Sequence, residues 1–269
     1  MTSLLSAVYT ICLLDLLLNV QLHTIGRYLF DETNKDAVDD AHEEGEDEDD
    51  EVDPSAFSRL LRADAPREFL ALAEHIYNKG VEDIVHRVRL AVNKRMETVS
   101  LKQQFNCPEL MQIVAEIRAD VEDTGDDDRV VLASAGSHPL AQYALEREGD
   151  APPPSDPTVR MLLDETRDIL DSPPLAETLA AMLDAAFASL GTVLGESVFA
   201  PPDRPKVGHE GTAGPLLSHF SLPLARLLPA LQRVPPRILS DSGENDVFLA
   251  LTELPELASF CAMVGAHTQ

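Results

Sequence analysis

A long apolar stretch near the start of the sequence, residues 4–30 (LLSAVYTICLLDLLLNVQLHTIGRYLF), constrains the fold more than any other feature. Many of its aliphatic residues recur at three-, four- and seven-residue steps, which places them on one helical face: Leu4, Val8, Ile11, Leu18, Leu22, Ile25 and Leu29. A second set recurs at strict four-residue steps, and it is polar: Asp15, Asn19, His23 and Arg27. A helix that is apolar over most of its circumference, with one narrow polar seam, is typical of the centre of a bundle.

The same stretch is long enough to span a membrane. A span would place Asp15 near mid-bilayer, followed by Asn19, Gln21 and His23, and the aspartate alone would cost a few kcal/mol. We therefore predict a buried bundle helix and keep a membrane span as the alternative.

Charge is distributed very unevenly along the sequence. Residues 31–53 contain fourteen carboxylates and a single lysine. Their net charge of −13 is half of the formal charge of the chain, −26. Such a block resists collapse and repels nucleic acid and anionic lipid. We predict that residues 31–55 form an acidic disordered loop and that the chain does not bind nucleic acid.

Helix-forming residues dominate the remainder, so the predicted class is all-α: an elongated helical bundle with long central helices and acidic or proline-rich loops. We expect residues 1–269 to form a single domain. Prolines and glycines predict the element boundaries: a helix starting at Pro66, a joint at Gly80, helices starting near Pro108 and over 158–171, a stop and restart at 172–174, a weak helix over 138–147, a helix capped by Ser221, and a break at Pro255.

Few residues suggest chemistry. Asp164 and Asp168 lie one helical turn apart in DETRD, as in the magnesium motif of helical isoprenoid synthases, but neither a second motif nor a basic cluster accompanies them. We therefore interpret them as the solvated face of an amphipathic helix. The histidines lack metal-ligand spacing, and the widely separated Cys12, Cys107 and Cys261 indicate reduced thiols. We predict no enzyme activity, no cofactor and no metal.

Four stretches, in this order, resemble the peroxin-3 family of peroxisomal docking factors. They are YTICLLDLLLNVQLHTIGRYLF in the first helix, TVSLK at 98–102 with EIR at 116–118, LLDETRDILDSP at 162–173, and SLPLAR at 221–226. The resemblance implies an all-α domain facing the cytosol at the peroxisomal membrane, which receives the N-terminal helix of the chaperone peroxin-19. Carried over by position, the docking residues would be Leu29, Leu101, Lys102, Leu224 and Arg226.

Two further expectations follow from this comparison with the family. The anchor and the first helix of the family's domain have no counterpart in the sequence, which suggests an N-terminally truncated or divergent form. Gly26 corresponds to a family glycine, and a glycine in the middle of a helix suggests close helix packing. The alternatives to a docking factor are a generic helical adaptor and a magnesium-dependent isoprenoid-type enzyme that uses Asp164 and Asp168.

Overall fold

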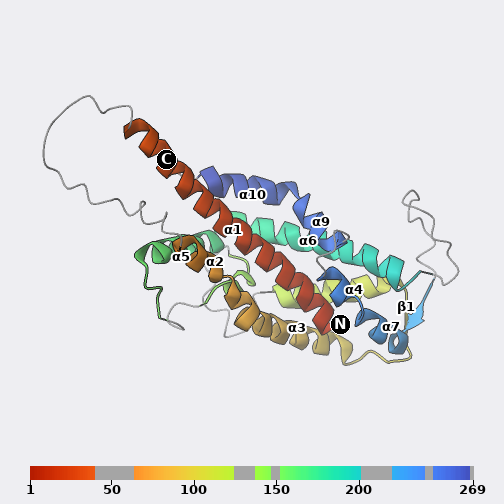
Figure 1. Cartoon of the computed structure of the whole chain (residues 1–269). Coiled ribbons are helices and arrows are strands. Elements are labelled where there is room, and N and C mark those ends of the chain that lie inside the picture. The colour runs from red at the N-terminus through yellow and green to blue at the C-terminus, as the bar shows by residue number, and fades with distance from the viewer. Residues whose placement is uncertain (40–63, 124–136, 147–151, 201–219, 240–244, 267–269) are drawn as a thin grey trace, which may run out of the picture.

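The computed structural model describes residues 1–39, 64–123, 137–146, 152–200, 220–239 and 245–266, with side chains from 31 to 39 excepted (Figure 1). This part of the chain is helical except for one two-stranded antiparallel ladder, which confirms the all-α prediction. The elements in chain order are α1 (Thr2–Asp39), α2 (Ala65–Ala71), a π-helix (Ile76–Gly80), α3 (Val81–Met96), β1 (Gln104–Phe105), α4 (Cys107–Glu122), a 3-10 turn (Ala141–Tyr143), α5 (Pro157–Leu170), α6 (Pro173–Ser197), β2 (Leu222–Pro223), α7 (Leu224–Leu231), α8 (Pro235–Ile238), α9 (Asp246–Thr252) and α10 (Pro255–Ala266).

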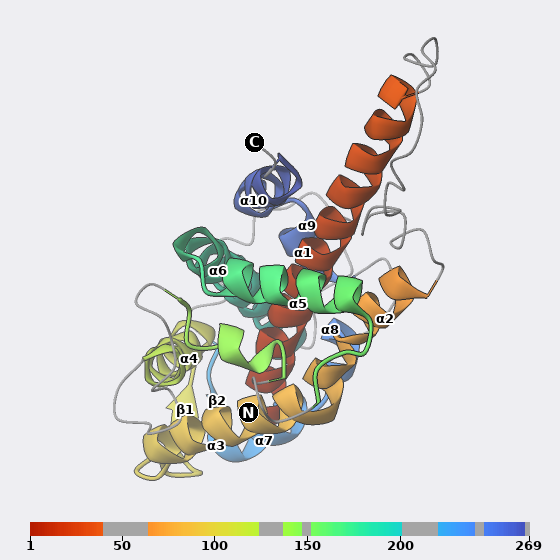
Figure 2. The same ribbon diagram turned by 90° about the vertical axis from the view of Figure 1, so that its left-hand side faces the viewer.

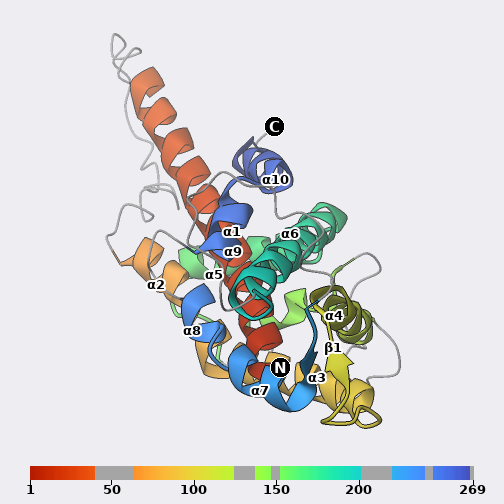
Figure 3. The same ribbon diagram turned by 90° about the vertical axis from the view of Figure 1, so that its right-hand side faces the viewer.

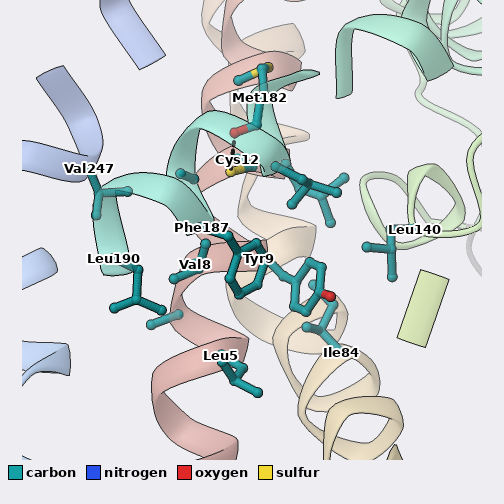
Figure 4. Close-up of a cluster of buried hydrophobic side chains, with 14 of the residues drawn as sticks. Leu5, Val8, Tyr9, Cys12, Ile84, Leu140, Met182, Phe187, Leu190 and Val247 are labelled. Carbon is teal, nitrogen blue, oxygen red and sulfur yellow. Dashed lines mark hydrogen bonds between the residues drawn. The ribbon is translucent and has the colours of Figure 1, made fainter. Parts of the chain in front are cut away.

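Helix α1 is the central helix of the bundle, as predicted. It packs against α2, α3, α5, α6, α8, α9 and α10, which surround it along its length (Figures 2 and 3). The core is built around its N-terminal half, where Leu5, Val8 and Tyr9 are fully buried (Figure 4). The Tyr9 ring meets Phe187 of α6 edge-on with centroids 5.3 Å apart. Apolar burial at this scale is the main term that holds the bundle together.

The apolar face predicted for α1 is buried at its N-terminal end but not throughout. Leu4, Val8 and Ile25 are buried, whereas 55% of Leu22 and 36% of Leu29 are exposed. The predicted apolar face is therefore not covered along its whole length. Periodicity identifies side chains that share a face, but not whether another element covers that face.

Helix α1 is also longer than predicted. It continues to Asp39, so residues 31–39 are helical rather than part of the acidic loop. Their charge is less dense than that of the residues after them, and Glu32, Lys35 and Ala37 favour helix. The rest of the predicted loop, 40–55, lies outside the described residues.

The joint at Gly80 is confirmed. It closes the π-helix between α2 and α3, and a side chain there would place Cβ 2.5 Å from the Tyr143 carbonyl oxygen. The stop and restart at 172–174 is also confirmed, and the Ser172 hydroxyl accepts from the Leu175 N–H at the start of α6. Ser221 does not cap a helix, because the chain first pairs as β2 and α7 starts at Leu224. The weak helix expected over 138–147 is reduced to the 3-10 turn.

Two of the described helices, α1 over Thr2–Phe30 and α6, are long and apolar enough to cross a membrane by length and composition. In the structure, 61% and 56% of their most apolar windows are buried within the protein. Their apolar character is thus used largely for packing against the other helices. The three cysteines are buried and free, as expected from their spacing.

Candidate docking sites

Two stretches that resemble the peroxin-3 family come together at one end of the molecule. β1 pairs with β2, with Gln104 opposite Pro223 and Phe105 opposite Leu222. The contact extends beyond the ladder, because the Ala225 N–H donates to the Leu101 carbonyl oxygen at 3.0 Å. We call this region, residues 98–105 with 221–226, the β1–β2 end; it lies beside the N-terminus of α1 (Figures 2 and 3).

Three of the five predicted docking residues are exposed at the β1–β2 end. Leu101 is 57% exposed, and Lys102 and Arg226 are exposed beside it in the sequence segments that the ladder joins. Leu224 lies in the core at 3% exposure, and its N–H donates to the Gln103 carbonyl oxygen at 2.9 Å. Leu224 therefore supports the surface rather than forming it.

The fifth predicted residue, Leu29, lies at the opposite end of α1. A rise of 1.5 Å per residue puts it roughly 40 Å along the helix from Thr2. There it adjoins a hollow of about 500 Å³ between α1 and α10, the α1–α10 hollow, which is lined by Leu22, His23, Gly26, Arg27, Phe30, Gly265 and Ala266. The structure thus does not bring Leu29 together with the other four residues.

Gly26 lies in this hollow and does not mediate close helix packing, so that expectation is wrong. A Cβ built on Gly26 would meet no atom within 4 Å, and the residue is exposed. Sequence reasoning also missed Phe30, which is 65% exposed and lies next to Leu29. The family resemblance drew attention to Leu29, but its exposed neighbours carried no separate signal.

The polar seam of α1 is covered by α10. Asn19 donates to the Asp15 carbonyl oxygen at 2.8 Å, and His23 bonds through Nδ1 to the Asn19 carbonyl oxygen at 2.9 Å. Burial raises the pKa of Asp15, and burial together with Asp15 raises the pKa of Cys261 on α10. The polar side chains of the seam are thus hydrogen-bonded within α1 where α10 packs against it.

The end of the seam contains an ion pair that sequence reasoning did not find. Arg27 donates to the Glu165 carboxylate on α5 and to the Val264 carbonyl oxygen on α10 at 3.3 Å. The Tyr28 hydroxyl donates to the other Glu165 oxygen at 2.9 Å. Burial and Glu165 raise the pKa of Tyr28. Helices α1, α5 and α10 are therefore joined through Arg27.

Asp164 and Asp168 lie on the exposed face of α5, as the solvated-face interpretation predicted. Asp164 pairs with Arg167 at 3.2 Å, one turn away. Within the described ranges no group of three or more His, Cys, Asp or Glu side chains is arranged to hold a metal ion.

Comparison with known proteins shows which family the chain is similar to. The Peroxin-3 family model matches residues 1–266. "Peroxisomal biogenesis factor 3" of Homo sapiens is 29% identical over 266 residues, covering 96% of the chain, and that of Rattus norvegicus is 30% identical over 228 residues, covering 83%. "Peroxisome biogenesis protein 3-1" of Arabidopsis thaliana is 22% identical over 272 residues. The matches span 65% of the human and 56% of the rat protein.

Proposed function

The chain belongs to the peroxin-3 family, and on that premise we propose that it acts in peroxisomal membrane biogenesis, as a docking protein for peroxin-19. The printed names of its relatives support the role in peroxisome biogenesis. The docking role rests on the family resemblance and on the surface that the β1–β2 end presents. We place the protein on the cytosolic side of the peroxisomal membrane and treat it as non-enzymatic.

We assign the docking surface to the β1–β2 end rather than to the hollow beside Leu29. The observation that carries this choice is Leu101, a 57% exposed leucine on a connection whose backbone is bonded to α7. A backbone that is already held in place loses little conformational entropy when a partner covers its side chain. Lys102 and Arg226 flank it with charge, which gives an apolar centre with a polar rim.

Titration of a labelled peptide of the peroxin-19 N-terminal helix tests this proposal by fluorescence anisotropy. The Leu101→Asp variant should weaken binding at least about ten-fold, because a central contact of an interface commonly contributes more than 1.4 kcal/mol. Leu249→Asp is the matched control, since Leu249 on α9 is exposed to a similar extent, 53%. Leu29→Asp should also leave binding unchanged.

Three results would overturn the proposal. Failure of the wild-type chain to bind the peptide would favour the generic helical adaptor. Equal losses for Leu101→Asp and Leu249→Asp would show that any new charge weakens binding, and loss with Leu29→Asp alone would move the docking site to the α1–α10 hollow.

A further inference from the structure

Helix α2 and the first half of α5, residues 157–162, share a small hydrophobic cluster that is separate from the main core. It contains five buried side chains, two from α2, two from α5 and one from α1: Ala65, Phe69, Val159, Leu162 and Ile25. The second half of α5 reaches the main core through Leu163 and Leu170. We call residues 65–71 and 157–162 the α2–α5 flap. Because buried apolar area is the main stabilising term, the flap is held to the bundle more weakly than the helices of the main core.

The flap covers a face of α1 that is largely polar. Four residues share this face, because they lie at three- and four-residue steps along the helix: Gln21, Thr24, Ile25 and Tyr28. The Gln21 side-chain nitrogen donates to the Phe69 carbonyl oxygen of α2 at 2.7 Å. The Gln21 Oε1 atom and the Thr24 hydroxyl are buried, and neither has a hydrogen-bond partner among the described residues. Since burial of an unpaired polar atom is unfavourable, these two atoms offset part of the stability gained when the flap is closed.

Glu165, one turn beyond the flap on α5, joins this region to α1. Its carboxylate accepts from Arg27 and, at 2.9 Å, from the Tyr28 hydroxyl. The Nε atom of Arg27 is buried without a partner in the described part of the chain. The closed arrangement therefore depends on one carboxylate, and the guanidinium that it binds is incompletely paired.

The packing around the flap is incomplete. A cleft of about 660 Å³ lies between α2, the π-helix and α5, and Leu72, Leu145 and Leu163 are among the residues that line it. The walls of such a cleft lack the contacts that a filled core would give them. The chain leaves α2 through the π-helix Ile76–Gly80, and sharp bends of helices occur where π-type turns interrupt the regular hydrogen bonding. The π-helix is therefore suited to act as a hinge.

We propose that the α2–α5 flap opens from α1 as a unit while the rest of the bundle stays folded, with the π-helix as its hinge and Glu165 as its latch. Weakly packed elements of native proteins open in this way with less free energy than global unfolding requires. Opening exposes the polar face of α1 to water, which supplies partners for Gln21 and Thr24. Arg27 also lines the α1–α10 hollow, so release of Glu165 changes one wall of that hollow. This motion does not depend on peroxin-19 or on the β1–β2 end.

Hydrogen–deuterium exchange of the full chain, followed by mass spectrometry, tests the opening. Peptides from α2 and from residues 157–162 should exchange in step, at least about ten-fold faster than α9 after correction for sequence. Helix α9 is the matched element, because it also has seven residues but contributes Val247 and Leu251 to the main core. Exchange of α2 at the rate of α9, or independent exchange of α2 and residues 157–162, would overturn the proposal.

Two variants change the closed state in opposite directions. Glu165→Gln should speed exchange of the flap about ten-fold and leave α9 unchanged, because hydrogen bonds to a charged acceptor are stronger than those to a neutral one. Asp164→Asn is its control on the same helix, since the Asp164 side chain is 63% exposed. Thr24→Val replaces an unpaired buried hydroxyl with a methyl group and should slow exchange of the flap.

Two outcomes of these variants count against a hinged flap. Equal acceleration of the flap and of α9 by Glu165→Gln would show that the ion pair stabilises the whole bundle rather than the flap. Faster exchange of the flap in Thr24→Val would show that this face of α1 does not weaken the closed state. Either result would contradict the proposal.

Discussion

The ion pair between Arg27 and Glu165 gives the sharpest test of how the bundle is held together. The Arg27 side chain is 5% exposed and that of Glu165 is 24% exposed. Among the described residues, replacing Glu165 with alanine leaves the buried guanidinium with one hydrogen bond, to the Val264 carbonyl oxygen. It also removes the acceptor of the Tyr28 hydroxyl. Removing one partner of a buried pair costs about 3–5 kcal/mol. We expect about 3 kcal/mol for Glu165→Ala, since its partial exposure admits some water.

Urea unfolding followed by far-UV circular dichroism measures this free energy. Asp164→Ala is the control on the same helix: its 63% exposed side chain pairs with Arg167, and such exposed pairs contribute about 0.5 kcal/mol or less. The double variant Arg27→Met, Glu165→Leu should recover much of the loss, because apolar replacement of a buried pair is often neutral. A Glu165→Ala cost no larger than that of Asp164→Ala would refute the argument.

Two of the helical glycines, Gly80 and Gly26, should respond with opposite signs to alanine. Gly80→Ala forces a Cβ against the Tyr143 backbone and should cost about 1–3 kcal/mol, whereas Gly26→Ala enters open space and should stabilise by about 0.5–1 kcal/mol in urea unfolding; losses of equal size would contradict this. His138 should make stability depend on pH, because burial lowers its pKa and its Nδ1 accepts the Leu140 N–H at 3.2 Å. The unfolded chain then binds the proton more readily, so this contribution is complete above about pH 6.5 and is lost as pH falls toward the lowered value. Between pH 7.5 and 5.5 the wild type should lose more stability than His138→Gln, and parallel losses would show that His138 does not contribute.

Helix starts and breaks were predicted well from the sequence, because the residues that cause them lie at the boundary itself. Prolines at or near the first turn identified the starts of α2, α4, α5 and α6 within a residue or two. The Gly80 joint followed from an interruption in an otherwise regular apolar period. Ser221 shows the limit: a serine before leucines looks like a cap, but here its hydroxyl donates to the Gln104 side chain and the chain is extended.

Contacts between distant segments could not be derived in this way. The β1–β2 ladder joins residues more than a hundred positions apart, and two short strands carry no periodic signal. Only the family resemblance placed Leu101 and Arg226 in one site. It also placed Leu29 there, and the structure separates them by most of the length of α1. The Arg27–Glu165 pair was missed for the same reason, since charge pairing across helices leaves no mark in the spacing.

Leu101 and Leu224 lie close together at the β1–β2 end but have different roles. At the N-terminal end of α1 the aliphatic side chains fill the core, and Leu101, the leucine proposed for docking, lies on a connection whose backbone is hydrogen-bonded to α7. Substitutions at Leu224 and at Leu101 should therefore change different properties of the protein, although both residues belong to segments that resemble the family. A change at Leu224 releases the backbone that positions Leu101 and must lower stability as well as binding. A change at Leu101 removes a contact from a surface that stays folded, so a loss of binding without a loss of stability distinguishes a contact residue from its support.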